Sequence, residues 1–338
     1  MHNKLIVILG PTATGKSALA VKLAKKFTRL NNFRQSRKLK SKKILFNWVN
    51  GGEIISADSR QVYIGLDIGS GKITKKEMAG IPHHLLDVAN PKRKFTVAQF
   101  QKLASKKIQE IQKRNFIPFL VGGTGFYIQS IVDGIIIPEV KPNWKLRKQL
   151  EKKSVKELFL MLKKLDPQRA SSIDPHNPRR LIRAIEIIKT TGKPVQTLRL
   201  RSGSSKNNDF LMIGIKKSPT ELKKAIAKRL QKRLKGMISE VKNLHKQGLP
   251  FKRLEELGLE YRFTAQYLQE KIDYKEMVTK LQKEIEHFAK RQMTWFSAHG
   301  GSASGGKHNK KIHWIKGQKE AEKLIRKFVN KKGLELTH

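Results

Sequence analysis

Cysteine is absent from the 338 residues of this chain. Without a thiol there is no disulfide, no thiolate ligand for zinc and no cysteine nucleophile. Long apolar runs are absent as well, since even the run at residues 5–9 is far shorter than the roughly 20 residues of a membrane-spanning helix. This run leads directly into a glycine-rich loop, so we interpret it as a buried strand and not as a signal peptide. We therefore expect a cytoplasmic protein that makes no membrane contact.

Acidic residues are few beside the basic ones. The chain has 27 Asp and Glu against 72 Lys and Arg, which gives a formal net charge of +45 at pH 7. Hydrophobic residues (38%) and charged residues (29%) are in the proportions of a globular protein, and the length allows one large or two modest domains. The charge predicts a polyanionic partner, with nucleic acid as our first interpretation and a general lysine bias as the alternative.

The most specific short motif is a glycine-rich loop at residues 10–17, which reads GPTATGKS. It fits the pattern G-x-x-x-x-G-K-[ST], in which backbone N–H groups surround a phosphate chain, the lysine supplies a point charge and the hydroxyl binds Mg²⁺. Its members are Gly10, Pro11, Thr12, Ala13, Thr14, Gly15, Lys16 and Ser17. The loop alone does not distinguish a diphosphate from a triphosphate.

Strands and helices alternate through the first part of the chain. Apolar strands are expected at 5–9, 53–57 and 116–121, and an amphipathic helix at 96–114. This order predicts an α/β fold, a parallel sheet like that of P-loop NTPases with helices on both faces. Ligands of such sheets bind at the carboxyl ends of the strands, so the phosphate loop, Asp58 and residues 122–124 are expected on one rim.

We predict four parts along the chain. They are a P-loop core at 1–138, an inserted helical domain at 139–199, a second and helical part of the core at 200–298, and a linker with a basic tail at 299–338. The first part carries a basic insertion at about 29–50. This insertion either contacts nucleic acid or is a solvated loop.

Asp58 and Thr124 are the polar residues that follow the second and third strands. Asp58 is either a ligand of Mg²⁺ or of a substrate hydroxyl, or a general base opposite the phosphates. Gln61, close behind it, has an amide able to pair with adenine. The GGTG sequence at 122–125 is either a tight turn at a helix start or a means of presenting the Thr124 hydroxyl to the reacting centre.

Arginines are concentrated in two helices. Arg179, Arg180 and Arg183 lie within about one turn, an arrangement suited to phosphodiesters unless this is only a solvated face. Arg229 and Arg233, one turn apart, border the apolar stripe of the helix at 219–247, so one of them either reaches inward to a phosphate or lies at the surface.

Several of these stretches together resemble the tRNA dimethylallyltransferases. The resemblance is carried, in order, by GPTATGKS, IISADSRQVYIGLDIGSGK, PHHLLD, LVGGTGFYIQ, DPHNPRRLIRAIE and KRQMTWF, and it covers residues 4 to about 297. It implies transfer of a dimethylallyl group from its diphosphate to N6 of the adenosine 3′ of the anticodon in tRNA, with Mg²⁺ as cofactor. The basic insertion and the Gly/Ser linker near residue 300 are departures outside the motifs.

The resemblance also implies roles for residues of this chain. Asp58 is then the general base, Thr14 and Thr124 lie near the reacting centre, and either Arg229 or Arg233 contacts the diphosphate. The target base has to leave the stack of the anticodon loop to reach the pocket. The implied tRNA contacts, to the anticodon stem-loop, are Asp58, Ser59, Arg60, Gln61, Thr124, Arg147, Arg179, Arg180, Leu181, Ile182 and Arg183. We expect a monomer.

Three other functions share part of this pattern. A P-loop kinase acting on a small metabolite would have the same loop and Asp58, but it gives no reason for the arginine helix. A non-enzymatic RNA-binding protein would not need an intact Lys16, Ser17 and Asp58. Prenylation of free adenine nucleotides would keep the chemistry but leave the arginine-rich insertion unexplained.

Overall fold

The computed structural model describes residues 3–32, 49–135, 137–138, 140–195, 209–299 and 312–330. Its centre is a six-stranded, entirely parallel sheet in the order β3-β2-β4-β1-β5-β6. The strands are β1 (Lys4–Leu9), β2 (Gly51–Ala57), β3 (His83–His84), β4 (Phe116–Gly122), β5 (Asp209–Ile215) and β6 (Ile312–Ile315). The α/β fold class predicted from the sequence is confirmed.

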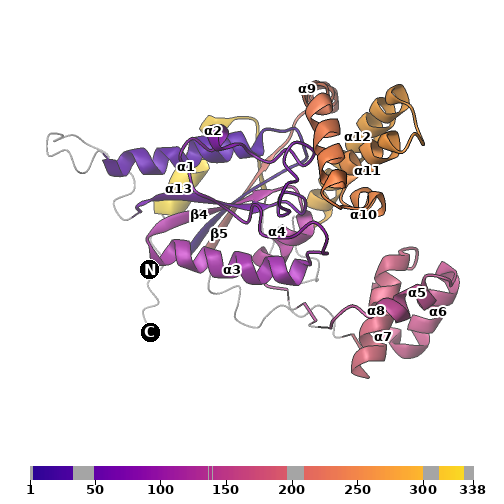
Figure 1. Cartoon of the computed structure of the whole chain (residues 1–338). Helices are drawn as coiled ribbons and strands as arrows, with labels where there is room; N and C mark the ends of the chain where they lie inside the picture. The colour runs from indigo at the N-terminus through magenta and orange to yellow at the C-terminus, as the bar shows by residue number, and fades with distance from the viewer. Residues whose placement is uncertain are drawn as a thin grey trace, which may run out of the picture. The chain divides into compact units, whose positions relative to one another are not determined.

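Helices cover both faces of the sheet (Figure 1). Alternate residues of β1 face opposite layers: Leu5, Val7 and Leu9 pack with α3 (Val97–Lys113) and α4 (Gly125–Val132). Ile6 and Ile8 pack on the other face with α1 (Lys16–Asn32) and α13 (Gln318–Asn330). Burial on both sides explains why this strand is continuously apolar and not alternating.

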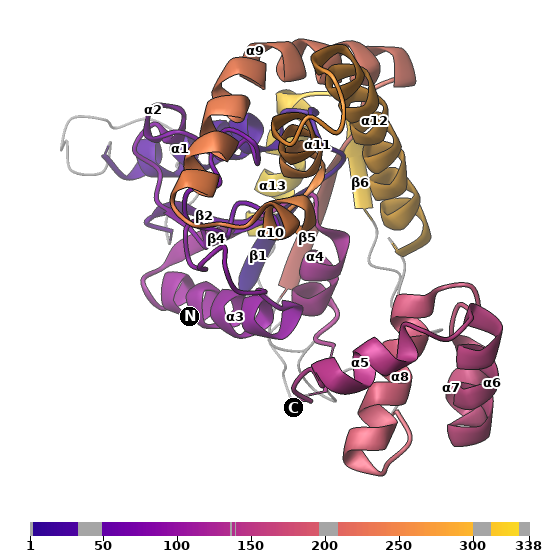
Figure 2. The same cartoon turned by 45° about the vertical axis from the view of Figure 1, so that its right-hand side comes forward.

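A helical layer closes the carboxyl edge of the sheet. It consists of α9 (Pro219–Lys246), α10 (Phe251–Glu256), α11 (Leu259–Leu268) and α12 (Tyr274–His299). Figure 2 shows α9, α11 and α12 side by side. Buried apolar residues of α9 pack against those of α12: Ile226, Leu230, Leu234 and Met237 meet Met277, Leu281, Ile285 and Ala289. This apolar stripe is the one that fixes which face of α9 turns inward.

The structure differs from the sequence expectation in the segment 200–298, which was expected to be helical and contains the strand β5. β5 pairs in parallel with β1 over Lys4–Leu9 and fills the position beside it in the sheet. The apolar run is too short for its periodicity to separate a strand from a helix. The first residues of the expected insertion at 29–50 continue α1, while 33–48, like 300–311 of the linker, lie outside the described residues.

The chain divides into two compact units, Met1–Asp133 with Ser205–His338, and Gly134–Ser204. The second unit is helical: α5 (Trp144–Leu150), α6 (Val155–Leu165), α7 (Pro167–Ser172) and α8 (Pro178–Thr191). Its own core includes Leu158, Leu162, Leu181 and Ile185. A short helix, α2 (Lys75–Met78), completes the first unit. Among the described helices, none combines the length and the apolar character that a membrane crossing requires.

Candidate active site

The phosphate loop connects β1 to α1 and is closed by bonds to its own backbone. Thr14 Oγ1 and Lys16 Nζ both donate to the carbonyl oxygen of Pro11, at 2.8 and 2.6 Å. Gly10 lies at φ +144°, and a Cβ there would come within 2.4 Å of the Ile215 oxygen. Glycine is therefore required where the loop leaves the sheet, because any side chain would displace β5.

Lys16 is half-buried and lies in the field of two opposite charges. Its pKa is lowered to about 8, chiefly because burial disfavours the ammonium form. Asp58 raises this pKa and Arg229 lowers it, burial remaining the largest effect. Three charged side chains from different segments therefore interact electrostatically: Lys16 of the phosphate loop, Asp58 after β2 and Arg229 of α9.

Asp58 follows the last residue of β2, and one of its two carboxylate oxygens is held by the backbone. Oδ1 accepts from the N–H groups of Arg60 (2.8 Å) and Gln61 (3.3 Å). No hydrogen bond of Oδ2 occurs within the described part of the chain. This fixes the direction of the carboxylate and leaves one oxygen for a substrate proton.

Thr124 joins the end of β4 to the Asp58 loop. Its N–H donates to the Ala57 oxygen at 3.2 Å, and its Oγ1 accepts from the N–H of Ser59 at 3.0 Å. The parallel sheet therefore brings the loops after β1, β2 and β4, which were expected on one rim, to the same edge. Thr124 also marks the start of α4, but its hydroxyl is used by Ser59 and not to cap that helix.

The amide of Gln61 is engaged within the protein. Its Oε1 accepts from Ser56 Oγ at 3.2 Å, and its Nε2 donates to the Gly71 oxygen at 3.2 Å. The amide thus ties the Asp58 loop to the segment at 67–72. Pairing with adenine, suggested by the residue type alone, would have to break these bonds.

Arg229 and Arg233 both reach inward from α9, to different partners. Arg229 Nη1 donates to Thr12 Oγ1 at 3.1 Å, and Arg233 Nη2 donates to the Gly69 oxygen at 2.6 Å. Burial, followed by the charge of Arg229, lowers the pKa of Arg233. Gly71, at φ +64°, has no side chain to collide with the two guanidinium groups. A Cβ there would come within 2.0 Å of Arg229 Nη2.

Sequence reasoning missed Glu240, which organises the segment that Arg233 touches. Its carboxylate accepts from three successive N–H groups, those of Asp67 (3.0 Å), Ile68 (2.6 Å) and Gly69 (3.0 Å). It also accepts from the hydroxyl of Tyr261 at 2.8 Å. Glu240 lies seven residues after Arg233 and therefore on the same face of α9. This spacing is the sequence signal that could have identified Glu240.

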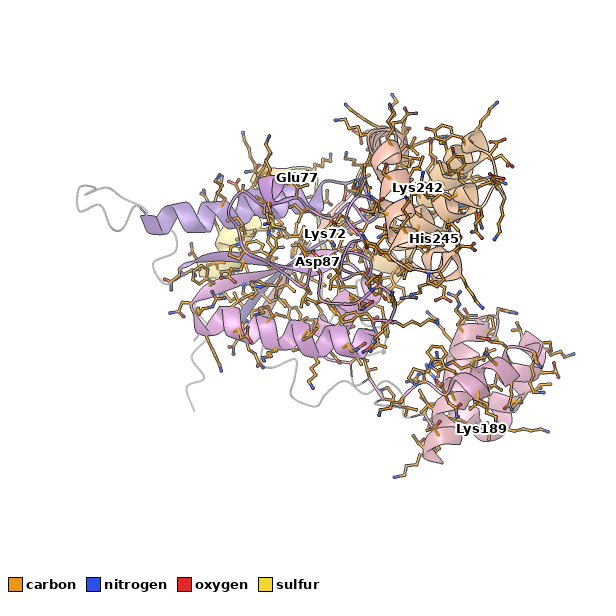
Figure 3. All side chains as sticks on the ribbon, viewed as in Figure 1. Lys72, Glu77, Asp87, Lys189, Lys242 and His245 are labelled. Atoms are coloured by element: carbon orange, nitrogen blue, oxygen red, sulfur yellow. The ribbon has the colours of Figure 1, made fainter. Side chains whose placement is uncertain are left out.

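The same segment is held at its other end by Lys72, whose side chain is 6% exposed. Its Nζ donates to the Tyr63 oxygen (2.9 Å) and to the carboxylates of Asp67 (2.6 Å) and Asp87 (2.5 Å). Figure 3 labels Lys72 and Asp87 near each other in the first unit. The IGSGK stretch is therefore shaped by the protein's own ion pairs.

Gln292 is a second residue that the sequence did not assign, although it lies in the quoted KRQMTWF. It is 8% exposed. Its Oε1 accepts from the N–H of Thr12 at 2.8 Å, and its Nε2 donates to the Gly123 oxygen at 2.9 Å. One side chain of α12 thus contacts both the phosphate loop and the turn after β4.

Glu260 at the start of α11 is a third residue near these arginines. It is half-buried, and its pKa is raised mainly by burial, with Arg233 opposing the shift. Arg60 lies against Gly258, the residue before α11, since a Cβ at Gly258 would come within 3.3 Å of Arg60 Nε. The half-exposed Arg60 side chain is therefore packed along the start of α11.

The four arginines that the sequence singled out in the helical unit fall into two groups. Arg147 makes two bonds to Glu186, which is 0% exposed, through Nε (2.8 Å) and Nη2 (2.7 Å), and Arg183 Nη1 binds the same carboxylate at 2.5 Å. Arg179 and Arg180 are exposed. Of these four, only Arg179 and Arg180 make no guanidinium hydrogen bond within the described chain.

Leu181 and Ile182, also implied as tRNA contacts, are 0% and 7% exposed. Their side chains pack in the core of the helical unit. Their side chains cannot reach RNA from the core, so only the main chain at these two positions is available for the implied tRNA contact.

The two histidines of PHHLLD, His83 and His84, form β3 at the edge of the sheet. His84 Nε2 lies 2.7 Å from Glu53 Oε2, and Arg114 makes two bonds to the same carboxylate at 2.7 and 2.8 Å. These contacts lower the pKa of Glu53, although its burial acts in the opposite direction. In the described residues no group of three or more His, Asp and Glu side chains is gathered as a metal site.

A phosphate loop, a fixed aspartate and an inward-facing arginine at the carboxyl edge of a parallel sheet define a P-loop α/β protein. Residues 61–299 match the family described as IPP transferase. A tRNA dimethylallyltransferase of Caldanaerobacter subterraneus subsp. tengcongensis is 37% identical over 307 residues, which are 88% of this chain and 90% of that relative. The chain therefore belongs to the IPP transferase family, as its resemblance predicted.

Solved structures agree with this assignment. The full-length tRNA isopentenylpyrophosphate transferase of Bacillus halodurans superposes with a TM-score of 0.63 at 34% identity, covering 97% of this chain and 95% of that one. A eukaryotic dimethylallyltransferase acting on tRNA gives a TM-score of 0.68 at 26% identity, covering 87% of this chain and 70% of that one.

Proposed function

We propose that this chain, a prenyltransferase of tRNA by its family, transfers a dimethylallyl group from dimethylallyl diphosphate to N6 of the adenosine 3′ of the anticodon. The observation that carries the proposal is the convergence of the phosphate loop, Asp58 and Arg229 at one edge of the sheet. The loop binds the leaving group, and the carboxylate serves the incoming amine. Lys16 is positive and suits the diphosphate, whereas Asp58 is negative and suits the proton of the amine, so one site serves both substrates.

The diphosphate is held by the phosphate loop, and Arg229 is the arginine that contacts it. Breaking the allylic C–O bond leaves positive charge on carbon and negative charge on the departing diphosphate. Lys16, Arg229 and the loop N–H groups are fixed before the reaction, so they stabilise this charge without reorganising. Arg233 has another role, which is to hold the Gly69 segment against α9.

Mg²⁺ fits this arrangement. Ser17 is exposed in the first turn of α1, directly after Lys16, and offers a hard oxygen ligand. Magnesium keeps several waters and is usually bound through one or two protein oxygens together with substrate phosphates, which needs no cluster of carboxylates. Bound there, it neutralises charge on the leaving group.

Asp58 is the general base in this proposal. An exocyclic adenine amine is a weak nucleophile, and it gains strength as its proton passes to a carboxylate. Oδ1 is fixed by Arg60 and Gln61, so Oδ2 receives the proton. Thr124 keeps Ser59 in place and lies next to the reacting atoms, as does Thr14.

The acceptor is the anticodon stem-loop of tRNA, with its target base flipped out of the stack. Arg179 and Arg180 bind phosphates, and Ser59 with Arg60 contacts the RNA near the base. The excess of positive charge supplies the non-specific part of the affinity. We further propose that the protein acts as a monomer in the cytoplasm.

The test is transfer of label from dimethylallyl diphosphate to bulk tRNA with Mg²⁺, for the unchanged protein and for Asp58→Asn. We expect Asp58→Asn to lower kcat by about 100-fold or more, as loss of a general base does. Asp209→Asn, an exposed aspartate at the start of β5, is the matched control and should keep full activity.

Two outcomes of this assay would contradict the proposed function. Label that enters AMP but not tRNA would keep the chemistry and replace the acceptor. Consumption of ATP without any prenyl transfer would favour the small-molecule kinase, which uses the same loop and aspartate for a triphosphate.

A further inference from the structure

We propose that Gln292 is a positioning residue, whose side-chain amide fixes the spacing between the phosphate loop and the loop that carries Asp58. The inference rests on the proposed function of these two loops and adds the residue that sets their distance. It concerns the rate of transfer and not the binding of either substrate.

The first observation is that one amide connects two loops that are remote in sequence. Thr12 N–H donates to Gln292 Oε1 at 2.8 Å, and Gln292 Nε2 donates to the Gly123 oxygen at 2.9 Å. The two contacts span 280 and 169 positions of the chain. Acceptor and donor of the amide are both used, so a residue of the same size without an amide satisfies neither loop.

The second observation is that the approach is close and depends on glycine. A Cβ at Gly123 would come within 2.4 Å of Gln292 Nε2, and one at Gly125 within 2.2 Å of Trp295 on the same helix. The turn after β4 thus lies directly on α12. Gln292 and Trp295, three residues apart, contact it from one face of the helix.

The hydrogen bonds continue from this turn to the aspartate. Gly123 is followed by Thr124, whose Oγ1 accepts from Ser59, and Ser59 follows Asp58. On the other side, Thr12 is the residue that Arg229 touches. Gln292 is therefore the link between the part that holds the diphosphate and the part that holds the base.

The placement of α12 does not depend on this amide. Leu281, Ile285 and Ala289 pack against α9 further along the same helix, and Phe296 joins the core below the sheet. Loss of the amide would leave the helix docked but free its two loop contacts. Misplacement of reacting groups by about 1 Å costs roughly 100-fold in rate, so the effect belongs to kcat.

The experiment compares Gln292→Met, which keeps the volume, with Gln292→Asn, which keeps the amide on a shorter side chain. Both should lower kcat by about 30-fold or more, while the KM for each substrate and the Kd for inorganic diphosphate stay within about threefold. The melting temperature should fall by only a few degrees, because two hydrogen bonds are lost while the apolar contacts of α12 remain. Gln282→Ala is the control on the same helix, because within the described residues that amide bonds only to Glu286 one turn away.

A second comparison separates this proposal from the proposed function. In an Asp58→Asn background, Gln292→Met should cost less than threefold, since residues that act as one unit are not additive. Full multiplication of the two effects would overturn the positioning role while leaving Asp58 as the base. A full rate for Gln292→Met, or a rate loss that follows the melting temperature across both variants, would also overturn it.

Discussion

Arg229 donates to the hydroxyl of Thr12 across 3.1 Å and 217 positions of sequence. This contact brings the middle of α9 onto the phosphate loop. Arg233, one turn further along, donates instead to the Gly69 oxygen at 2.6 Å. The two arginines therefore have separate partners, although both lie on the inward face of α9.

We expect Arg229→Ala to weaken the Kd for inorganic diphosphate by about tenfold or more and to lower kcat further, because it removes the donor that we propose for the leaving group. Arg233→Ala should change that Kd less and lower the melting temperature more, since the Gly69 oxygen loses its partner. Titration calorimetry and thermal unfolding measure both effects. Lys228→Ala, an exposed neighbour on α9, is the control, and a larger diphosphate effect at Arg233 would contradict the assignment.

The lowered pKa of Lys16, about 8 in the folded protein against 10.5 for an ordinary lysine, predicts a pH dependence of diphosphate binding. Above pH 8 the free protein has lost this proton, and binding the anion restores it. Affinity should therefore fall by up to about tenfold per pH unit above 8, with uptake of a proton. Calorimetry at pH 7, 8 and 9 in buffers of different ionisation enthalpy measures that uptake.

The control for this measurement is Lys16→Arg, which stays charged throughout and corrects for the protonation of diphosphate itself. The same shift has a consequence for folding. Because the unfolded chain keeps this proton up to about pH 10.5 while the folded chain loses it near 8, the contribution of Lys16 to the free energy of unfolding rises between these values. Equal proton uptake by the unchanged protein and Lys16→Arg at pH 9 would contradict the pKa.

The two groups of arginines in the helical unit should respond differently to substitution. Replacing exposed Arg179 and Arg180 by alanine should weaken tRNA binding and reduce the slope of log affinity against log salt by roughly 0.7–0.9 for each lost phosphate contact. The melting temperature should not change. Binding measured from low to physiological salt tests this, and an unchanged slope would exclude both as phosphate ligands.

Glu186→Gln is the contrasting variant. It removes the buried charge that faces Arg147 and Arg183, and breaking a buried ion pair costs about 3 kcal/mol at the lower end of the usual range. The lower end applies because both arginines are partly exposed. We expect a less stable helical unit, detected by thermal unfolding or hydrogen exchange, with no loss in the salt slope of tRNA binding once the protein is folded.

Much of the fold and part of the site could be predicted because the signals are local. The phosphate loop is one short segment between a strand and a helix, so its residues need no distant partner to be recognised. The carboxyl-edge rule then brought Asp58 and Thr124 to the same rim, and the apolar stripe of α9 marked its inward face. The strand β5 was missed because a short apolar run has no periodicity of its own that excludes a helix.

The sequence by itself determined the α/β sheet, the phosphate loop, the aspartate beside it and the family, since each depends on residue type and close spacing. Only the tertiary structure shows that Arg229 and Arg233 have different partners within the protein, because residues one helical turn apart share a face and differ only in what packs against them. It also decided that Arg147 and Arg183 serve Glu186 and that Gln292 links Thr12 to Gly123. Such partners come from distant segments, and the packing of the whole chain brings them within hydrogen-bond distance.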